Sequence, residues 1–268
     1  MRDQPWTASL PRMRRSFGFD ELVPHLTAAG IDLTIVVQTV CVPEETPELL
    51  ALAAKASRVA GVVGWVDLSS PACAEQLTTL SEGPAGDRLV GVRHQVQSEP
   101  DPQWLARPEV RRGLEAVASH GLVYDLVVTP DQLPGVLDVV RAIPQLRYVL
   151  DHAGKPRIAA GEFDSWRRDL AALAAEPNLA VKLSGLVTEA DLTTWTVGDL
   201  RPYADAVLEL FGAARVMIGS DWPVCLLAAS YAEVMASAEA LTGSLDPAER
   251  ADVFGGTAMG WYRIAGPQ

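Results

Sequence analysis

The sequence predicts an α/β fold, a (β/α)8 TIM barrel that apparently lacks its first strand at the N-terminus. Seven short apolar runs rich in β-branched residues alternate with longer helical patterns. The polar residues that end successive runs lie 27 to 37 residues apart, the length of one strand and one helix. No GxGxxG motif follows the first run, which favours a barrel over a doubly wound sheet.

Each predicted strand reads as buried on both faces, as expected of a parallel sheet covered by helices. The predicted strands are 31–38, 62–67, 89–94, 122–128, 147–152, 179–185 and 215–221. In a barrel, the polar residues at the carboxyl ends of these strands would meet at one face, where barrel enzymes carry their active sites.

Helical periodicity, punctuated by Pro, Asp or Gly, predicts the helices between these strands. The predicted helices are 19–30, 47–60, 108–121, 164–177, 201–212, 230–243 and 247–264. Residues 1–16 are polar and interrupted by proline, which suits a loop and not a buried strand. A closed barrel needs eight strands, so the sequence predicts a single domain over 1–268 whose first strand is missing by N-terminal truncation.

Composition excludes several classes of partner. The 268 residues carry a formal net charge of −12, which argues against binding to nucleic acid or to an anionic membrane. Cys41, Cys73 and Cys225 form no CxxC pair, so neither a disulfide framework nor a cysteine zinc site is predicted. Without a signal peptide or a run of about 20 apolar residues, we expect a cytoplasmic protein.

Two polar positions at strand ends are the strongest candidates for chemistry. Asp221 follows the apolar run in VMIGSDWPV, where it is either a turn or helix-capping residue or a carboxylate that binds metal or takes a proton from water. His152 follows Asp151 at the end of RYVLDH and is either a buried histidine satisfied by its neighbour or part of the same site. Both would lie at the same face of a barrel.

Other polar residues interrupt apolar strands. Arg93 and His94 are consecutive, so one faces the barrel interior and the other faces outward. Lys182 and Ser184 share a face, and a lysine within an apolar strand is rarely placed there for packing. The remaining candidates, each with a purely structural alternative, are Gln38, Asp67, Asp125 and Trp222, whereas His25 and His120 are expected to be structural.

Four motifs, DHAGKP (151–156), VKLSGL (181–186), GVRHQVQ (91–97) and GSDWPVC (219–225), resemble the amidohydrolase-related TIM-barrel family that includes the L-fuconolactonases and L-rhamnonolactonases. The resemblance implies a barrel that hydrolyses a sugar-derived lactone. It further implies that His152 and Asp221 match the family's histidine of strand six and aspartate of strand eight. Arg93, His94 and Lys182 would match its polar residues that face the substrate.

The family usually begins with a strand that ends in a His-x-His pair and helps to hold a divalent metal. The four histidines here, His25, His94, His120 and His152, form no such pair. The resemblance therefore implies a zinc site at His152 and Asp221 that lacks two of its usual ligands.

From these residues we derive a hypothesis for ring opening. Asp221 would activate water, while His152 and Arg93 polarise the lactone carbonyl. Lys182, Gln38 and Asp125 would bind the sugar hydroxyls, with His94 and Trp222 also lining the substrate site. Two alternatives remain open, a metal-dependent decarboxylase of the same superfamily and an inactive truncated remnant, and the sequence predicts no oligomeric state.

Overall fold

The computed structural model describes Thr7 and residues 10–264. Within these residues, seven parallel strands form one sheet in the order β1-β2-β3-β4-β5-β6-β7. The strands are β1 (Thr34–Val37), β2 (Val59–Gly64), β3 (Leu89–His94), β4 (Val123–Leu126), β5 (Arg147–Leu150), β6 (Leu179–Leu183) and β7 (Val216–Ile218). Each of the seven strands predicted from the sequence overlaps one of these strands, and the second is shifted toward the N-terminus.

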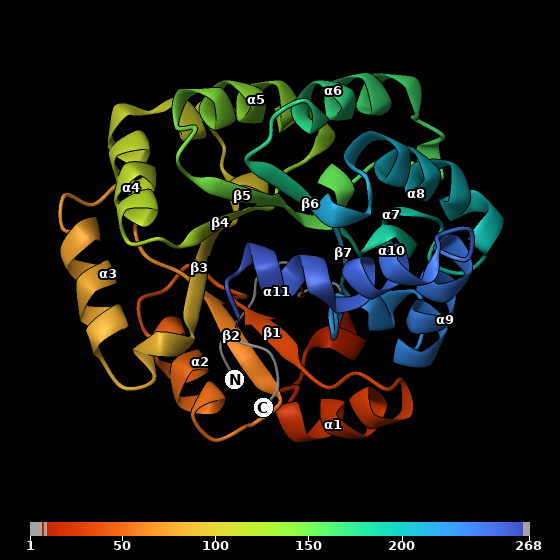
Figure 1. Cartoon of the computed structure of the whole chain (residues 1–268), viewed down its shortest axis with the longest axis horizontal. Coiled ribbons are helices and arrows are strands. Elements are labelled where there is room, and N and C mark those ends of the chain that lie inside the picture. Colours follow the sequence, from red (N-terminus) through yellow and green to blue (C-terminus); the bar gives the residue numbers. More distant parts are fainter. Residues whose placement is uncertain (1–6, 8–9, 265–268) are drawn as a thin grey trace.

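Helices surround the curled sheet (Figure 1). They are α1 (Phe19–Ala28), α2 (Glu45–Ala53), α3 (Cys73–Glu82), α4 (Pro108–Ser119), α5 (Leu133–Ala142), α6 (Asp164–Ala174), α7 (Leu186–Glu189), α8 (Val197–Phe211), α9 (Tyr231–Leu241), α10 (Pro247–Ala251) and α11 (Thr257–Trp261). A π-helical turn, Asp252–Gly256, joins α10 to α11. Among the described residues, none of these helices is both long and apolar enough to cross a bilayer.

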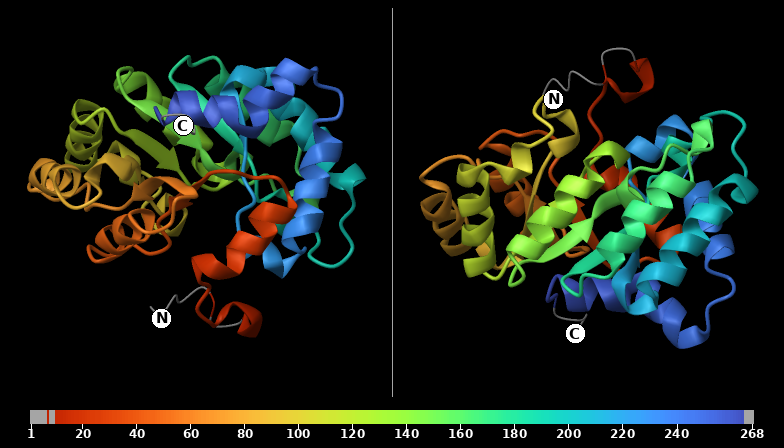
Figure 2. Two further views of the ribbon diagram at one scale, coloured as in Figure 1. Left: turned by 60° about the horizontal axis from the view of Figure 1, so that its bottom comes forward. Right: turned by 90° about the horizontal axis from the view of Figure 1, so that it is seen from above.

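The curled sheet has the shape expected of a barrel, and it ends at two edges. In the part of the chain that the structure describes, β1 pairs with β2 alone and β7 pairs with β6 alone. The two views of Figure 2 show the sheet curving between these edges, with the helices outside it. The fold is thus an α/β half-barrel consistent with the predicted TIM barrel.

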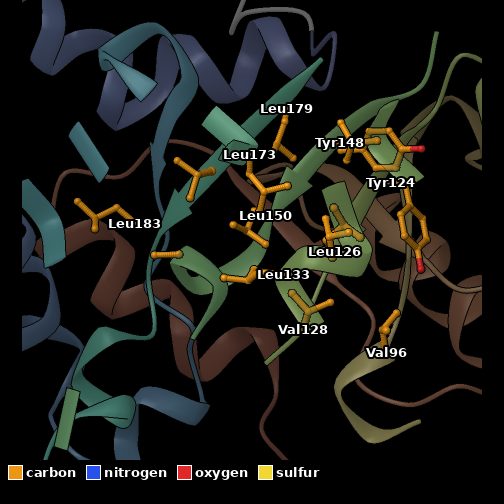
Figure 3. Close-up of a cluster of buried hydrophobic side chains, with 14 of the residues drawn as sticks. Val96, Tyr124, Leu126, Val128, Leu133, Tyr148, Leu150, Leu173, Leu179 and Leu183 are labelled. Atoms are coloured by element: carbon orange, nitrogen blue, oxygen red, sulfur yellow. The ribbon is translucent and has the colours of Figure 1, made fainter. Parts of the chain in front are cut away.

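Two apolar layers stabilise this arrangement. The larger lies between the sheet and the outer helices, where Tyr124, Leu126, Tyr148 and Leu150 point outward from β4 and β5 (Figure 3). A second cluster fills the inside of the curled sheet and is closed by the C-terminal segment around α11, which crosses the middle of the sheet in Figure 1. This inner cluster determines how deep the site can extend.

The second strand lies earlier than predicted. It ends at Gly64 rather than at Asp67, because the Thr46 hydroxyl bonds to both the backbone N–H (2.7 Å) and the carbonyl (2.8 Å) of Trp65 and draws the chain away from the sheet. Asp67 is therefore not a strand-interior carboxylate. Its Oδ1 instead accepts hydrogen bonds from the backbone and the hydroxyl of Ser69 in the following turn.

Two helical glycines provide a test of this packing. A Cβ built on Gly113 of α4 would lie 2.3 Å from the Leu68 carbonyl oxygen, whereas one built on Gly135 of α5 would meet nothing within 4 Å. We expect Gly113→Ala to lower the free energy of unfolding by about 1–3 kcal/mol or more through overpacking. Gly135→Ala should raise it by up to about 1 kcal/mol through helix propensity. Urea unfolding measures both, and equal effects would contradict the packing of α4 on Leu68.

Candidate active site

The inward-facing residues of the central strands form two layers. The lower layer is small or apolar, with Gly91, Val123, Val149 and Ala180 contributed by β3, β4, β5 and β6. Two residues further along each chain segment, on the same face, lie Arg93, Asp125, Asp151 and Lys182. The upper layer is therefore ionic throughout, and it lies toward the carboxyl ends of the strands.

These four side chains form a continuous network of opposite charges. Arg93 Nη1 lies 2.7 Å from Asp151 Oδ2, and Lys182 Nζ lies 2.7 Å from Asp151 Oδ1 and 2.5 Å from Asp125 Oδ2. Both carboxylates are fully buried, whereas the side chains of Arg93 and Lys182 remain 13% and 14% exposed. The two cations therefore form the accessible surface of the network.

The surroundings shift the pKa values of the two carboxylates in opposite directions. Burial raises the pKa of Asp125 above its usual range, against the opposing effect of Lys182. Burial also disfavours the charged form of Asp151, but Lys182 and Arg93 outweigh it and hold its pKa well below the usual range. Lys182 loses solvation too, yet the two carboxylates raise its pKa, so it remains a cation at neutral pH.

Gln38 supports Arg93 from the end of β1. Arg93 Nε donates to Gln38 Oε1 at 3.2 Å, and Nη2 donates to the Gln38 carbonyl oxygen. Gln38 is fully buried, as is Asp125, so each orients a cation instead of presenting its own surface. A guanidinium carries five N–H donors and an ammonium three, so Arg93 and Lys182 each retain donors for a ligand.

His152 and Asp221 come together beside this network, as predicted. His152 Nδ1 lies 2.9 Å from the Ser184 hydroxyl, and its Nε2 lies 3.8 Å from Asp221 Oδ1. A separation of 3.8 Å is too long for a hydrogen bond, so both groups can contact a third molecule. Burial disfavours the charged form of Arg93, but Asp151, Asp125 and Asp221 raise its pKa, so Asp221 lies within electrostatic reach of this cation.

The backbone at these positions is unusual. His152, Ala153 and Lys155 have φ of 52°, 52° and 55°, and Asp221 has φ of 54°. Left-handed conformations cost non-glycine residues about 1–2 kcal/mol each. Surrounding contacts hold the turn 151–154, since Trp166 Nε1 donates to the Ala153 carbonyl at 2.8 Å and Lys155 N donates to the His152 carbonyl at 2.8 Å.

His94 points to the opposite side of β3 from Arg93, as the alternation of the strand requires. Trp65 Nε1 donates to its Nδ1 at 3.0 Å, its Nε2 lies 2.6 Å from Glu99 Oε1, and its ring stacks on Trp104 at a centroid distance of 4.1 Å. Burial lowers the pKa of His94 despite the neighbouring Glu99. Both ring nitrogens therefore have protein partners, and His94 lies apart from the charge network.

The remaining sequence candidates lie at the margin of the site or outside it. Trp222, the residue after Asp221, packs edge-on against Phe17 at 5.6 Å and against the larger apolar cluster. His25 stacks on Tyr231, and His120 contacts Thr78 and the Ala116 carbonyl. Neither histidine is joined to the network by any contact of the described residues.

Sequence reasoning missed three residues of the site. Asp151 appeared as a partner of His152, yet it bonds to Arg93 and Lys182 instead. Gly185 has φ of 67°, and a Cβ there would lie 2.8 Å from His152 Nδ1, so its absence leaves room for the imidazole. The glycine in the sequence Ser184-Gly185-Leu186, directly after a strand, could have indicated this close approach. Tyr262, whose hydroxyl reaches Asp125, follows a helix at the far end of the chain and carries no such signal.

The donor set for a metal is incomplete within the described residues. His152 Nε2 and Asp221 Oδ1 are the two available ligands, and no group of three or more His, Cys, Asp or Glu residues there is arranged to hold an ion. A catalytic zinc ordinarily takes about three protein ligands. The described residues thus do not fit a complete zinc site, and we derive no chemical step through a metal.

A parallel α/β barrel that gathers a histidine, an aspartate and two cations at the carboxyl ends of its strands has the architecture of a barrel enzyme. A family model described as amidohydrolase matches residues 7–264. The chain therefore belongs to the amidohydrolase family.

Individual relatives agree with this assignment. Two proteins named L-fucono-1,5-lactonase, from Burkholderia ambifaria and Burkholderia multivorans, are 39% and 41% identical to this chain. Each comparison covers 99% of this chain and 92% of the relative. A crystal structure of an amidohydrolase from Burkholderia multivorans with bound zinc superposes with a TM-score of 0.92 at 39% identity, over 97% of this chain and 94% of that chain.

Gly185 offers a direct test of how His152 is placed. Alanine at this position must adopt a positive φ, which costs about 1–2 kcal/mol, and its Cβ would displace the His152 ring. We expect Gly185→Ala to reduce turnover by about 10²-fold, the typical effect of displacing a reacting group by about 1 Å.

Gly161→Ala is the matched control for this variant. Gly161 has a similar φ of 68°, but a Cβ there meets nothing within 4 Å. Both variants carry the same backbone cost, and Gly185→Ala should lose further stability in thermal unfolding through its contact with His152. Gly161→Ala alone should keep its turnover. Equal turnover in the two variants would show that Gly185 does not control the position of His152.

Proposed function

We propose that this protein is a hydrolase that opens a sugar-derived lactone, such as L-fucono-1,5-lactone or a similar aldonolactone, by attack of water on the ester carbonyl. The observation that carries the proposal is the pairing of His152 Nε2 and Asp221 Oδ1 at 3.8 Å beside the exposed donors of Arg93 and Lys182. The two relatives named as L-fucono-1,5-lactonases support the choice of substrate class.

In the proposed reaction, Asp221 accepts a proton from water, and the water oxygen forms a bond to the lactone carbonyl carbon. His152 and the free N–H groups of Arg93 stabilise the resulting oxyanion. Collapse of the tetrahedral species breaks the bond between that carbon and the ring oxygen, which takes the proton back from Asp221. The product is a hydroxy acid that ionises at neutral pH and releases one proton to solution.

Substrate orientation is assigned to the remaining polar residues. Lys182 retains one N–H donor beyond its two carboxylate partners and would bind a sugar hydroxyl. Gln38 and Asp125 would contribute by holding Arg93 and Lys182 in place, and Trp222 would form a wall of the site. His94 would act on substrate only through the loop that carries Glu99, its partner at 2.6 Å.

Lactone hydrolysis accounts for the site better than the two alternatives. The two relatives named as lactonases, at 39% and 41% identity, favour lactone hydrolysis over a decarboxylase of this superfamily. An inactive remnant would not need a network in which two cations keep unused donors at the surface.

The proposal also covers the eighth strand of the barrel and the cellular compartment. We propose that the space between β7 and β1 is the position of the barrel's remaining strand, because each of these strands pairs on one side alone within the described residues. We also assign the protein to the cytoplasm, since Cys41, Cys73 and Cys225 form no disulfide, as suits a reducing compartment.

Asp221→Asn tests the assigned base. Asparagine tolerates the left-handed backbone at this position, so the fold should be retained while the ability to accept a proton is lost. We expect turnover to fall by about 10²–10⁴-fold. Proton release, followed with a pH indicator, would be measured on L-fucono, L-rhamnono, L-galactono and D-glucono lactones.

Asp67→Asn is the control. Asp67 also follows a strand, but its carboxylate lies outside the site and accepts hydrogen bonds from the backbone and the hydroxyl of Ser69. Its turnover should match that of the wild type. Near wild-type turnover in Asp221→Asn would refute Asp221 as the base, and a wild-type protein inactive on every lactone would refute the substrate class.

Metal content provides a separate prediction. Two protein ligands bind zinc weakly compared with the usual three, so we expect well under one equivalent to remain after dialysis. Elemental analysis of wild type and His152→Ala measures this. A full equivalent retained by the wild type and lost in the variant would contradict the prediction.

A further inference from the structure

We infer that Tyr262, from the C-terminal segment, is a positioning residue of the active site that acts through Asp125 on Lys182. The inference rests on the proposed function, because it assigns Lys182 to substrate binding. Its basis is that the Tyr262 hydroxyl lies 2.8 Å from each carboxylate oxygen of Asp125.

The lower layer of the sheet interior creates the space that Tyr262 fills. Inward-facing residues there are small or modest in size, and a Cβ on Gly91 would lie 3.6 Å from Tyr262 Cε1. Tyr262 is 3% exposed and belongs to one apolar cluster with residues of five strands: Val63, Val123, Val149, Ala180 and Met217. Tyr262 therefore enters from the end of the sheet opposite His152 and Asp221.

The C-terminal segment is anchored so that the hydroxyl reaches the upper layer. Trp261 Nε1 donates to the Tyr148 carbonyl at 3.1 Å, and Arg147 Nη1 donates to the Gly260 carbonyl at 3.2 Å. Both contacts join the end of α11 to β5. The position of the tyrosine is thus determined on both sides, by its ring packing and by its neighbours in the chain.

The Tyr262 hydroxyl donates a hydrogen bond to Asp125 Oδ1, the oxygen that Lys182 does not contact. Lys182 bonds to Asp125 Oδ2 from β6, while Arg93 and Asp151 act on the same carboxylate through their charges from β3 and from the turn after β5. Without Tyr262, Asp125 Oδ1 would lose its hydrogen bond among the described contacts. The Lys182 ammonium also lies 5.7 Å from the centre of the Tyr262 ring, within the range of a cation–π interaction.

Two consequences follow from removing the hydroxyl while keeping the ring. The hydroxyl stabilises the ionised form of Asp125, so its loss raises the pKa of Asp125 and moves the titration midpoint to higher pH. A less ionised Asp125 holds Lys182 less firmly, so substrate binding weakens. Because Lys182 does not take part in bond making, KM should change and kcat should not.

The experiment compares Tyr262→Phe with Tyr148→Phe. Tyr148 is also a fully buried tyrosine, but it lies in the outer layer (Figure 3), and its hydroxyl has a single contact at 3.4 Å, to the Val139 carbonyl. The Asp125 carboxyl carbon is followed by ¹³C NMR as pH is varied in the free protein. KM and kcat are measured on the lactone that the wild type hydrolyses best.

We expect Tyr262→Phe to raise the Asp125 midpoint by about one pH unit and KM by about 10-fold, the scale of a lost hydrogen bond to a charged group. Turnover should stay within about 2-fold, since no oxyanion donor is removed. Tyr148→Phe should change neither quantity. An unchanged midpoint and KM in Tyr262→Phe overturns the inference, as does an equal loss of kcat in both variants.

A second variant keeps the test decisive where Tyr262→Phe does not fold. 3-Fluorotyrosine at position 262 retains the ring and has a more acidic hydroxyl, a stronger donor, so the Asp125 midpoint should move to lower pH. No movement there overturns the inference. A protein inactive on every lactone refutes the proposed function, while the NMR midpoint still reports whether Tyr262 holds Asp125.

Discussion

The structure depends on two buried carboxylates and on the two partly exposed cations that compensate their charge. An isolated ion in a protein interior costs several kcal/mol in lost solvation, and the carboxylates of Asp125 and Asp151 are fully buried. Each is compensated by a cation from another strand, and Arg93 lies directly opposite Asp125 in the pairing of β3 with β4. A slip of one residue would turn these side chains toward the apolar helix layer. The charges thus favour the single register that also forms the site.

The proposed catalytic pair, His152 and Asp221, has by contrast a backbone conformation that these residue types disfavour. His152, Ala153, Lys155 and Asp221 have left-handed backbones, and residues without a glycine's freedom resist this by about 1–2 kcal/mol each. Such strain persists where the surrounding structure determines the conformation. Here the indole of Trp166, buried in the outer core, holds the turn by its hydrogen bond to Ala153. Outer-layer packing therefore fixes the direction in which His152 points.

Local pattern predicted the strands well, because a run buried on both faces is apolar throughout and its spacing reflects one helix per strand. Alternation likewise separated Arg93 from His94. The pattern failed where a distant contact decides the outcome. Thr46 ends β2 before Asp67, and Asp151 pairs with two cations from other strands rather than with its neighbour. Tyr262 lies 137 residues from Asp125, and the periodicity of a sequence does not predict a contact between residues so far apart.

The two carboxylates share a lysine but differ in the rest of their surroundings. Asp151 forms ion pairs with two cations near the mouth, which favours its ionised form, whereas Asp125 has one cation and a neutral hydroxyl at the closed end. The environment therefore separates their pKa values in opposite directions. The permanent charge of Asp151 lies next to Arg93 and holds its guanidinium in place. A preorganised cation of this kind stabilises an oxyanion without reorganising during the reaction, which is the demand that ester hydrolysis makes on a site.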